Sequence, residues 1–176
     1  MLRVALLGCG RWGQNHLRVL SSLKQRGLIS HITVVDILQS ARRSAELADD
    51  VTDSMEGVQA DLVIVATPSA LHAQQSQELV SKGYHVLVEK PLGSCEVEAA
   101  QVIASARENG RILGVGLLLR FHPAVKTANQ MLNNGKLGRL ESLRFVRRST
   151  RQAPKGGNVI ESLGVHAIDL LSLIHI

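Results

Sequence analysis

The residues best suited to chemistry in this chain follow one short apolar segment. Residues 84–89 read Tyr-His-Val-Leu-Val-Glu, and Lys90 and Pro91 come directly after them. Open α/β sheets bind their ligands at the carboxyl ends of the strands, so a lysine in this place is expected to face the ligand crevice. Pro91 disfavours helical backbone at Lys90 and holds that residue extended or in a turn. Lys90 is therefore predicted to be a fixed functional group.

Lys90 suits the proton-transfer half of an alcohol oxidation. Such a reaction moves a hydride from carbon to a nicotinamide and removes the hydroxyl proton. A partly desolvated lysine beside the positively charged oxidised ring has its pKa lowered from about 10.4 toward the working pH. It can then accept the proton or stabilise a developing alkoxide. The alternative role for Lys90 is an ion pair with Glu89.

A glycine-rich segment near the N-terminus predicts a dinucleotide site. Gly8, Gly10 and Gly13 follow an apolar run and have the spacing G-x-G-x-x-G. The first glycine permits a tight turn, the second lets the backbone approach a pyrophosphate, and the third lets helix and strand pack closely. The phosphates then meet the N-terminus of the next helix, so Arg11 and Trp12 are also expected at the cofactor. A purely structural turn is the alternative.

Asp36 is the residue expected to bind the adenosine ribose. It lies twenty-three residues after Gly13 and ends the second predicted strand. Its carboxylate can accept from the ribose hydroxyls and would repel a 2′-phosphate, so NAD is expected rather than NADP. Arg42 and Arg43 keep NADP possible, because either could reach such a phosphate. The alternative role for Asp36 is to cap a helix.

Two further groups complete the predicted site. Thr67 and Pro68 follow the strand expected beside the first one, where they can line the nicotinamide riboside, and His72 comes one turn into the next helix. His72 either contacts the ligand or has a structural role. His166 and Asp169 lie three residues apart on the final predicted helix and share a face. They suit proton transfer or form a simple surface pair, and neither spacing nor ligand count supports zinc.

Strand and helix signals alternate as in a doubly wound parallel α/β sheet of order 3-2-1-4-5-6. Strands are predicted at residues 2–7, 32–36, 61–67, 84–89 and 111–118, helices at 11–26, 39–48, 69–82 and 95–109, and a rudimentary strand and helix within 49–60. Ser69 is the predicted cap of its helix. The pattern then predicts a helix at 122–134, a strand at 140–149, a loop at 152–158 and a helix that continues to 176. We expect a dinucleotide-binding domain over 1–120 and an incomplete second α/β domain over 121–176.

Composition narrows the class of protein and its partners. The chain has 176 residues, 45% of them apolar, which is ordinary for a globular protein. Aromatic residues are scarce, which argues against a protein that stacks nucleic-acid bases. The net charge of +5 comes mostly from basic residues within 139–155, a solvated face or a site for a phosphorylated ligand. A basic nucleic-acid-binding protein is the remote alternative.

The location is expected to be cytoplasmic. Cys9 and Cys95 have no paired-ligand spacing and are typical of reduced thiols. Met1 is followed at once by a buried strand, which leaves no room for a signal peptide. Residues 159–176 are apolar but contain Glu161, His166 and Asp169, so they make a poor membrane span.

Three segments together give the chain a specific resemblance. Residues 8–16, 67–72 and the Glu-Lys-Pro-Leu-Gly sequence at 89–93 resemble the Gfo/Idh/MocA family, the glucose–fructose oxidoreductase and inositol dehydrogenase group. The resemblance implies an N-terminal Rossmann domain, a tightly held nicotinamide cofactor, sugar or cyclitol substrates, and homo-oligomers formed through the sheet of a C-terminal domain. It also implies that Lys90 is catalytic, that Glu89 lies at the cofactor, and that the peptide bond before Pro91 is cis.

The resemblance extends in part to the substrate residues. The family's Asp-x-x-x-His motif matches His166, but Ser162 stands in the aspartate position, and a serine cannot act as a carboxylate base. Residues 116–125 are similar to a stretch of the nucleotide-sugar 3-dehydrogenases in this family and include Arg120. Arg120, Ser162, His166 and Asp169 are therefore the expected substrate residues, and a nucleotide sugar is a candidate substrate.

Length limits the activity that the resemblance implies. Family members are roughly twice as long as this chain, so we expect it to form a cofactor-binding domain but to turn over poorly. The competing function is a non-catalytic dinucleotide-binding module.

Overall fold

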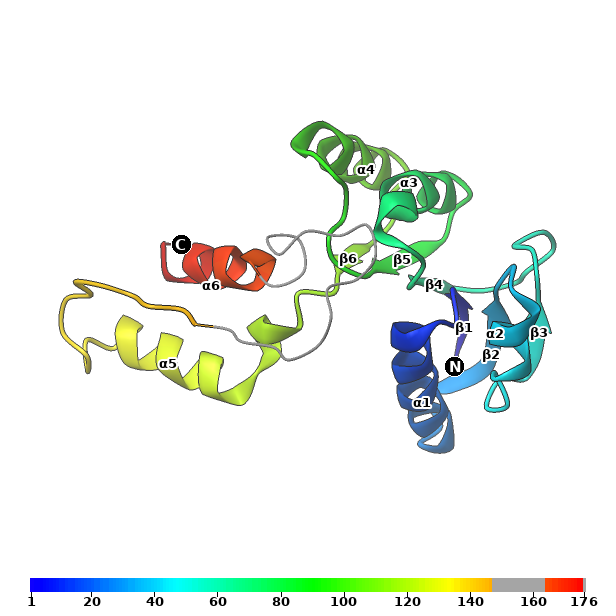
Figure 1. Cartoon of the computed structure of the whole chain (residues 1–176), viewed down its shortest axis with the longest axis horizontal. Coiled ribbons are helices and arrows are strands. Elements are labelled where there is room, and N and C mark those ends of the chain that lie inside the picture. The colour runs from blue at the N-terminus through cyan, green and yellow to red at the C-terminus, as the bar shows by residue number, and fades with distance from the viewer. Residues whose placement is uncertain (147–163, 176) are drawn as a thin grey trace. The chain divides into compact units, whose positions relative to one another are not determined.

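The computed structural model describes residues 1–146 and 164–175 (Figure 1). Its contacts divide the chain into two units, residues 1–116 and 117–176. In the first unit six parallel strands form one sheet of order β3-β2-β1-β4-β5-β6, which confirms the predicted order. The strands are β1 (Leu2–Leu7), β2 (Ile29–Val35), β3 (Asp50–Thr52), β4 (Leu62–Val65), β5 (His85–Val88) and β6 (Leu113–Val115).

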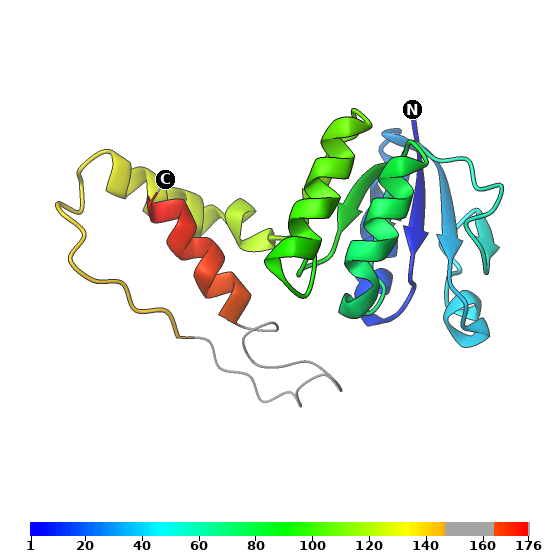
Figure 2. The same ribbon diagram turned by 90° about the horizontal axis from the view of Figure 1, so that it is seen from above.

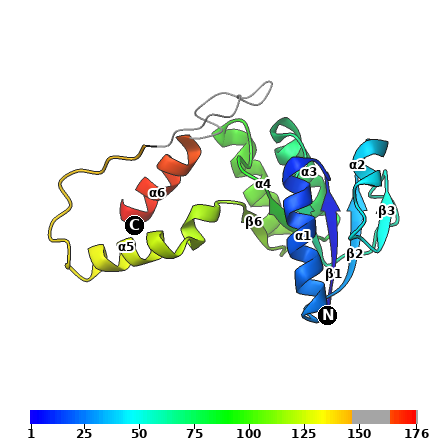
Figure 3. The ribbon, with the colours of Figure 1, turned by 60° about the horizontal axis from the view of Figure 1, so that its bottom comes forward.

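Helices cover both faces of this sheet (Figure 2). The helices α1 (Arg11–Gln25) and α2 (Gln39–Arg43) lie on one face, and α3 (His72–Ser81) and α4 (Glu96–Glu108) lie on the other. Figure 3 shows β3 with α2 at one edge of the sheet and β6 with α4 at the other. The chain is therefore a doubly wound α/β structure over its first unit.

Two hydrophobic clusters explain why the central strands are largely apolar. Alternate side chains of a strand point to opposite faces of a sheet, and here both faces are covered. Val4 and Leu6 of β1 belong to the cluster that contains Leu17 of α1. Ala5, between them, belongs to the cluster that contains Leu79 of α3. The strands β1, β2, β4 and β5 thus contribute to both clusters, β6 contributes to the second alone, and the edge strand β3 belongs to neither.

Several element bounds differ from the prediction. β2 begins at Ile29 rather than at residue 32, because Ile29 pairs with Leu2 and is buried. The helix predicted over 39–48 ends at Arg43, after which Ala45 and Ala48 donate to carbonyls three residues back in tight turns. Of the strand and helix predicted within 49–60, only the strand β3 is present.

The segment after β4 also starts differently. The predicted helix cap Ser69 makes no side-chain capping hydrogen bond and instead begins a 3-10 turn, η1 (Ser69–Leu71), so that α3 starts at His72. The predicted strands that became β4, β5 and β6 are each shorter than expected, whereas α4 lies within one residue of its predicted bounds.

The second unit contains, among the described residues, η2 (Leu118–Phe121), α5 (Pro123–Asn133) and α6 (Val165–His175). The His122 side chain caps α5 by accepting from the Ala124 N–H. The predicted strand at 140–149 does not form over residues 140–146, and a lone strand has no partner for its backbone groups. The predicted loop at 152–158 and the start of the final helix lie outside the described residues. Within residues 1–146 and 164–175 no helix is long and apolar enough to cross a membrane.

Candidate functional site

The loop after β1 and the loop after β4 touch through backbone. Gly8 has a φ of +91°, a conformation that side chains rarely adopt, and its N–H donates to the Val35 carbonyl at 2.8 Å. A Cβ at Gly8 would lie 2.8 Å from the Thr67 nitrogen. β1 and β4 are the neighbours between which the strand order reverses, so this contact lies at the expected ligand-binding point of the sheet.

The other two glycines of the loop have opposite surroundings. A Cβ at Gly13 would lie 2.1 Å from the carbonyl oxygen of Gly8, so this position packs directly on the turn. A Cβ at Gly10 would meet nothing within 4 Å, and Gly10 has a φ of −70°. Gly13 therefore serves packing, while Gly10 leaves open space against bare backbone. That space fits the pyrophosphate of a dinucleotide.

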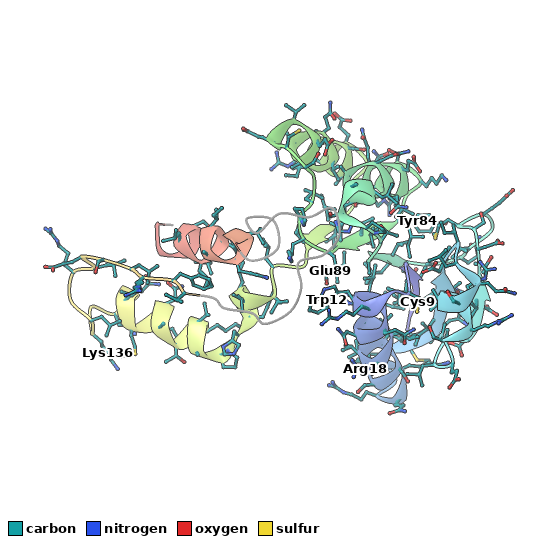
Figure 4. The ribbon with its side chains drawn as sticks, viewed as in Figure 1. Cys9, Trp12, Arg18, Tyr84, Glu89 and Lys136 are labelled. Atoms are coloured by element: carbon teal, nitrogen blue, oxygen red, sulfur yellow. The ribbon has the colours of Figure 1, made fainter. Side chains whose placement is uncertain are left out.

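The N-terminus of α1 favours an anion. No side chain caps the helix, and its first turn holds no acidic residue. The first N–H groups of a helix lack partners within it, and the helix dipole places partial positive charge there. Arg11 and Trp12, the first two helical residues, are exposed, and Figure 4 labels Trp12 at the start of α1. The loop, the open space at Gly10 and this helix end together form a site that residues 8–13 can offer to a diphosphate.

Asp36 is attached to the same loop. Its Oδ2 accepts from the Cys9 N–H at 2.7 Å and its Oδ1 accepts from the Leu38 N–H at 2.8 Å. Each carboxylate oxygen can accept a second hydrogen bond, so Asp36 can still receive ribose hydroxyls. Burial, and then the charge of Asp36, raise the pKa of the Cys9 thiol. Cys9 thus stays uncharged behind the loop.

Arg42 is held by the backbone next to Asp36. Its Nη1 donates to the carbonyl oxygen of Asp36 at 2.7 Å and to that of Ile37 at 3.0 Å. This attachment bears on cofactor choice, because Arg42 was one of two arginines that could reach a 2′-phosphate. The other, Arg43, is exposed.

The residue before Lys90, Glu89, is paired with His16 of α1. His16 Nε2 lies 2.8 Å from Glu89 Oε1, and the side chains are 23% and 14% exposed. Burial alone would raise the pKa of Glu89, but the hydrogen bond and charge of His16, together with the backbone N–H and charge of Lys90, outweigh it and lower that pKa. The Lys90 N–H contacts Glu89 Oε2 at 3.3 Å. Lys90 itself is half-buried.

Two backbone features adjoin this pair. The Lys90–Pro91 peptide bond is cis, as the resemblance implied. A Cβ at Gly116, just after β6, would lie 3.1 Å from Glu89 Oε2, so a larger residue there would crowd the carboxylate. The segment that carries Lys90 is thus closely surrounded by α1 on one side and the end of β6 on the other.

His72 joins the segment after β4 to the segment after β5. Its ring is 2% exposed, with Nδ1 at 2.7 Å from the Pro91 carbonyl oxygen and Nε2 at 2.9 Å from that of Thr67. The Thr67 hydroxyl donates to Gln75 Oε1 at 2.6 Å. Both ring nitrogens of His72 are therefore hydrogen-bonded to backbone carbonyls. These contacts favour a structural role for His72 over contact with the ligand. Pro68 is exposed beside it.

The substrate residues expected in the second unit group around Arg120. Arg120 Nε donates to Asp169 Oδ1 at 2.5 Å and Nη2 donates to Ser172 Oγ at 3.0 Å. His166 and Asp169 are both buried, so they are not a surface pair. The Asp169 carboxylate is held by Arg120. Ser162 lies outside the described residues.

Sequence reasoning did not assign a role to two residues of this site. His16 lies three residues after Gly13, on the second turn of α1, and its closeness to the glycine loop could have indicated a role at the site. Gly116 lies inside the strand predicted at 111–118, where a glycine often marks the close approach of another group. The sequence around His16 and Gly116 does not predict that either lies beside Glu89, because both contacts depend on the pairing of β1, β4, β5 and β6.

Comparison with known proteins agrees with this geometry. Residues 2–117 match the GFO_IDH_MocA family, described as an oxidoreductase family with an NAD-binding Rossmann fold. The chain is 27% identical over 177 residues to inositol 2-dehydrogenase 2 from Saccharopolyspora erythraea, a match that covers 96% of this chain and 52% of that protein. The chain thus spans about half the length of the curated relatives it matches.

Solved structures have the same fold. The WlbA dehydrogenase from Bordetella pertussis, in complex with NADH and UDP-GlcNAcA, has a TM-score of 0.70 and 26% identity over 78% of this chain and 42% of that one. The scyllo-inositol dehydrogenase from Lactobacillus casei, with NAD(H) and scyllo-inositol, has a TM-score of 0.82 over 99% of this chain and 56% of that one. At 18% identity, the second likeness shows the fold alone.

Proposed function

Because this chain belongs to the Gfo/Idh/MocA family of NAD-binding oxidoreductases, we propose that it binds NAD at the carboxyl ends of β1, β4 and β5 and places Lys90 at the reacting carbon. The proposed reaction is hydride transfer between the nicotinamide and a hydroxyl of a sugar, cyclitol or nucleotide sugar. When bound, NAD supplies the hydride acceptor.

One observation carries this proposal: the predicted cofactor loop and the predicted catalytic segment are connected by direct contacts. Gly8 approaches the Thr67 backbone, His72 lies between Thr67 and Pro91, and His16 of the helix after the loop holds Glu89. Groups that come from segments far apart in the sequence therefore meet at the carboxyl ends of β1, β4 and β5. A structural glycine turn and an unrelated surface lysine would need no such connection.

The adenosine half would be held by Gly8, Gly10, Gly13 and Asp36. Bare backbone at Gly10 and the positive end of α1 would receive the pyrophosphate, with Arg11 and Trp12 beside it. Asp36 would accept from the ribose hydroxyls and repel a 2′-phosphate. The hydrogen bonds from Arg42 to the backbone support NAD over NADP, because they direct that guanidinium away from a role as phosphate clamp.

The nicotinamide half would be held by Thr67, Pro68 and the segment 89–91. Lys90 would take the proton of the substrate hydroxyl, as a half-buried lysine near a second positive charge does more readily than a free one. Glu89, held ionised by His16 and by the Lys90 backbone, would keep the segment in place while Lys90 acts.

The relatives support the substrate class. Inositol 2-dehydrogenase 2 is named for a cyclitol, and the WlbA structure contains a nucleotide sugar. We propose that Arg120, His166 and Asp169 contribute to substrate binding, with His166 as a second proton-transfer group and Ser162 in place of a carboxylate. Homo-oligomers, a cytoplasmic location and the lack of a nucleic-acid partner stay predictions.

Cofactor binding can be measured directly, because Trp12 is the only tryptophan. Excitation of Trp12 during titration with NADH should show saturable quenching, and NADPH should require a higher concentration. Asp36→Asn removes the charge but keeps an acceptor oxygen, and it should narrow the difference between the two cofactors by about tenfold. Absence of quenching, together with absence of NAD or NADH binding by calorimetry, would contradict the proposal.

A second candidate function is a dinucleotide-binding module without turnover, favoured by Ser162 at the aspartate position of the family motif. A panel of inositols, sugars and UDP-sugars, assayed by NADH formation, separates the two. Turnover that falls by about 10²-fold or more in Lys90→Met supports the dehydrogenase. NADH binding with no turnover on the whole panel supports the module.

A further inference from the structure

Among the residues that the structure describes, the ring nitrogens of His72 have two hydrogen-bond acceptors as partners and no donor. Nδ1 is 2.7 Å from the carbonyl oxygen of Pro91 and Nε2 is 2.9 Å from the carbonyl oxygen of Thr67. The ring is 2% exposed, so water has little access to either nitrogen. These two carbonyls belong to the segments that follow β4 and β5, the two strands whose ends border the proposed nicotinamide site.

This arrangement defines the protons on the ring. A neutral imidazole donates from one nitrogen and accepts at the other, and a carbonyl oxygen cannot donate. A neutral His72 would therefore point a lone pair at one of the two carbonyl oxygens at hydrogen-bond distance. Only a ring with hydrogen on both nitrogens satisfies both contacts, and hydrogen bonds from a charged donor are the stronger ones.

We propose that His72 is a positioning residue that donates from both ring nitrogens, as an imidazolium, and so fixes the segment of Thr67 to the segment of Lys90. This inference rests on the proposed function, since it assigns His72 to the nicotinamide half of the same site. His72 acts through backbone and does not itself touch the reacting atoms.

The charges around the ring come from few elements. The first turn of α3, which begins with His72, has no acidic residue, and a helix N-terminus disfavours positive charge. The segment after β5 brings Glu89 and Lys90, and α1 brings His16, which is bonded to Glu89. The helix α4 brings Glu98, which accepts hydrogen bonds from Ser94 of the preceding loop. The two carbonyl oxygens are therefore the groups that favour a charged ring.

His72 and His16 hold the Lys90 segment from opposite faces of the sheet. His16 comes from α1 and binds the side chain of Glu89, one residue before Lys90. His72 comes from α3 and binds the carbonyl of Pro91, one residue after Lys90. Thr67 also lies against Gly8 of the cofactor loop. The hydrogen bonds of His72 to Thr67 and Pro91 therefore help to set the distance between Lys90 and that loop. The adenosine site at Asp36 has no part in these contacts.

Nuclear magnetic resonance of the histidine rings tests the proton positions in the unaltered chain. A ¹H–¹⁵N spectrum of the side chains, assigned with His72→Gln, should show both nitrogens of His72 carrying hydrogen under the conditions of NADH binding. A His72 ring with one unprotonated nitrogen would overturn the double donation. This measurement does not depend on whether the variant binds cofactor.

Ligand binding tests the positioning role. Gln at position 72 can reach only one of the two carbonyls, so His72→Gln should weaken NADH binding by about tenfold, as for the loss of a hydrogen bond to a charged group. It should leave the binding of ADP, which lacks the nicotinamide half, within about twofold of the unaltered chain. The matched control is His31→Gln, since His31 pairs with Asp50 on β2 and β3 away from these segments. His31→Gln should change the affinity for neither NADH nor ADP.

The outcomes separate this inference from the function on which it rests. Equal losses of NADH and ADP affinity in His72→Gln, or no loss of either, would overturn the positioning role. An unaltered chain that binds neither ligand would instead contradict the proposed function, and the ring spectrum would then decide on the double donation alone.

Discussion

Gly10 and Gly13 lie in one loop, yet an added methyl group would meet opposite surroundings at the two positions. At Gly13 it would lie 2.1 Å from the Gly8 carbonyl, and at Gly10 it would meet nothing within 4 Å. Gly13→Ala should therefore lower the free energy of unfolding by about 1–3 kcal/mol, the usual cost of overpacking. Gly10→Ala should change it by less than about 0.5 kcal/mol, because the backbone there suits any residue.

NADH affinity should show the reverse contrast. The methyl group of Gly10→Ala would occupy the space proposed for the pyrophosphate, so binding should weaken by about tenfold, or about 1.4 kcal/mol, in a fully stable protein. Urea unfolding and Trp12 quenching measure the two quantities. Normal NADH binding by Gly10→Ala would remove the pyrophosphate from this loop.

Glu89 should make the stability of the fold depend on pH in the acid range. Its pKa in the folded chain is lowered, so its stabilising contribution is complete above the unfolded pKa of about 4.3 and is lost as the pH falls through the lower, folded value. Glu89→Gln should cost about 1–2 kcal/mol at neutral pH. The difference between the two chains should shrink below about pH 4, as measured by urea unfolding in a pH series.

The exposed Glu108, at the end of α4, provides the control. Glu108→Gln should cost little at any pH, since exposed substitutions usually change stability by less than about 0.5 kcal/mol. A cost for Glu89→Gln that is constant or grows toward low pH would contradict the pairing with His16.

Residue types alone predicted the charged and glycine positions of the candidate site but not the hydrogen bonds that its histidines make. The glycine spacing, the acid after β2 and the lysine before a proline are local patterns, and their positions could be predicted from the sequence. The sequence could not decide whether His72 contacts the ligand or has a structural role, because its two carbonyl partners are set by the pairing of β4 with β5. His16 was missed for the same reason, since its partner Glu89 lies 73 residues away.

Secondary-structure elements could be predicted where one pattern dominated. Continuous apolar runs predicted the buried strands, and the alternation of strand and helix predicted their order, because crossovers between parallel strands have a fixed hand. The helix predicted over 39–48 was cut short where the carbonyl and hydroxyl oxygens of Ser44 accept hydrogen bonds from Gln14 of α1, a tertiary contact. The strand predicted over 140–149 failed within 140–146, because alternation alone supplies no neighbouring strand.

An ion pair joins Arg120 of η2 to Asp169 of α6. Arg120 Nε lies 2.5 Å from Asp169 Oδ1, with side chains 37% and 4% exposed. Asp169→Asn should destabilise this attachment by about 1–3 kcal/mol, less than for a fully buried pair because solvent reaches Arg120. Hydrogen exchange of the amides in α6 should accelerate accordingly.

Ser172 offers a graded comparison for that pair. Its hydroxyl accepts from Arg120 Nη2 at 3.0 Å, so Ser172→Ala removes one hydrogen bond and leaves the ion pair. The expected effect is about 1 kcal/mol or less on the same amides. Exchange in α6 that is unchanged by Asp169→Asn would show that α6 does not depend on the pair.

At the scale of the whole molecule, the first unit contains both hydrophobic clusters and the residues proposed to bind the cofactor. Every residue of both hydrophobic clusters, and of the apolar side chains packed against them, lies between Val4 and Val115. The glycine loop, Asp36, His16, His72 and Lys90 lie within the same span, and Gly116 completes the surroundings of Glu89. Arg120, His166 and Asp169, the residues proposed to bind the substrate, lie beyond it.

A fragment of residues 1–116 should therefore unfold cooperatively and bind NADH within about twofold of the affinity of the whole chain, as expected for sites that do not share partners. It should show no sugar oxidation. A fragment of residues 1–112 is the matched control: it lacks β6, whose Leu113 and Val115 pack on the second cluster and whose backbone pairs with β5, and it should neither unfold cooperatively nor bind. If residues 1–116 fold but lose NADH affinity, residues of the second unit must belong to the cofactor site, and the assignment of that site to β1, β4 and β5 alone would be wrong.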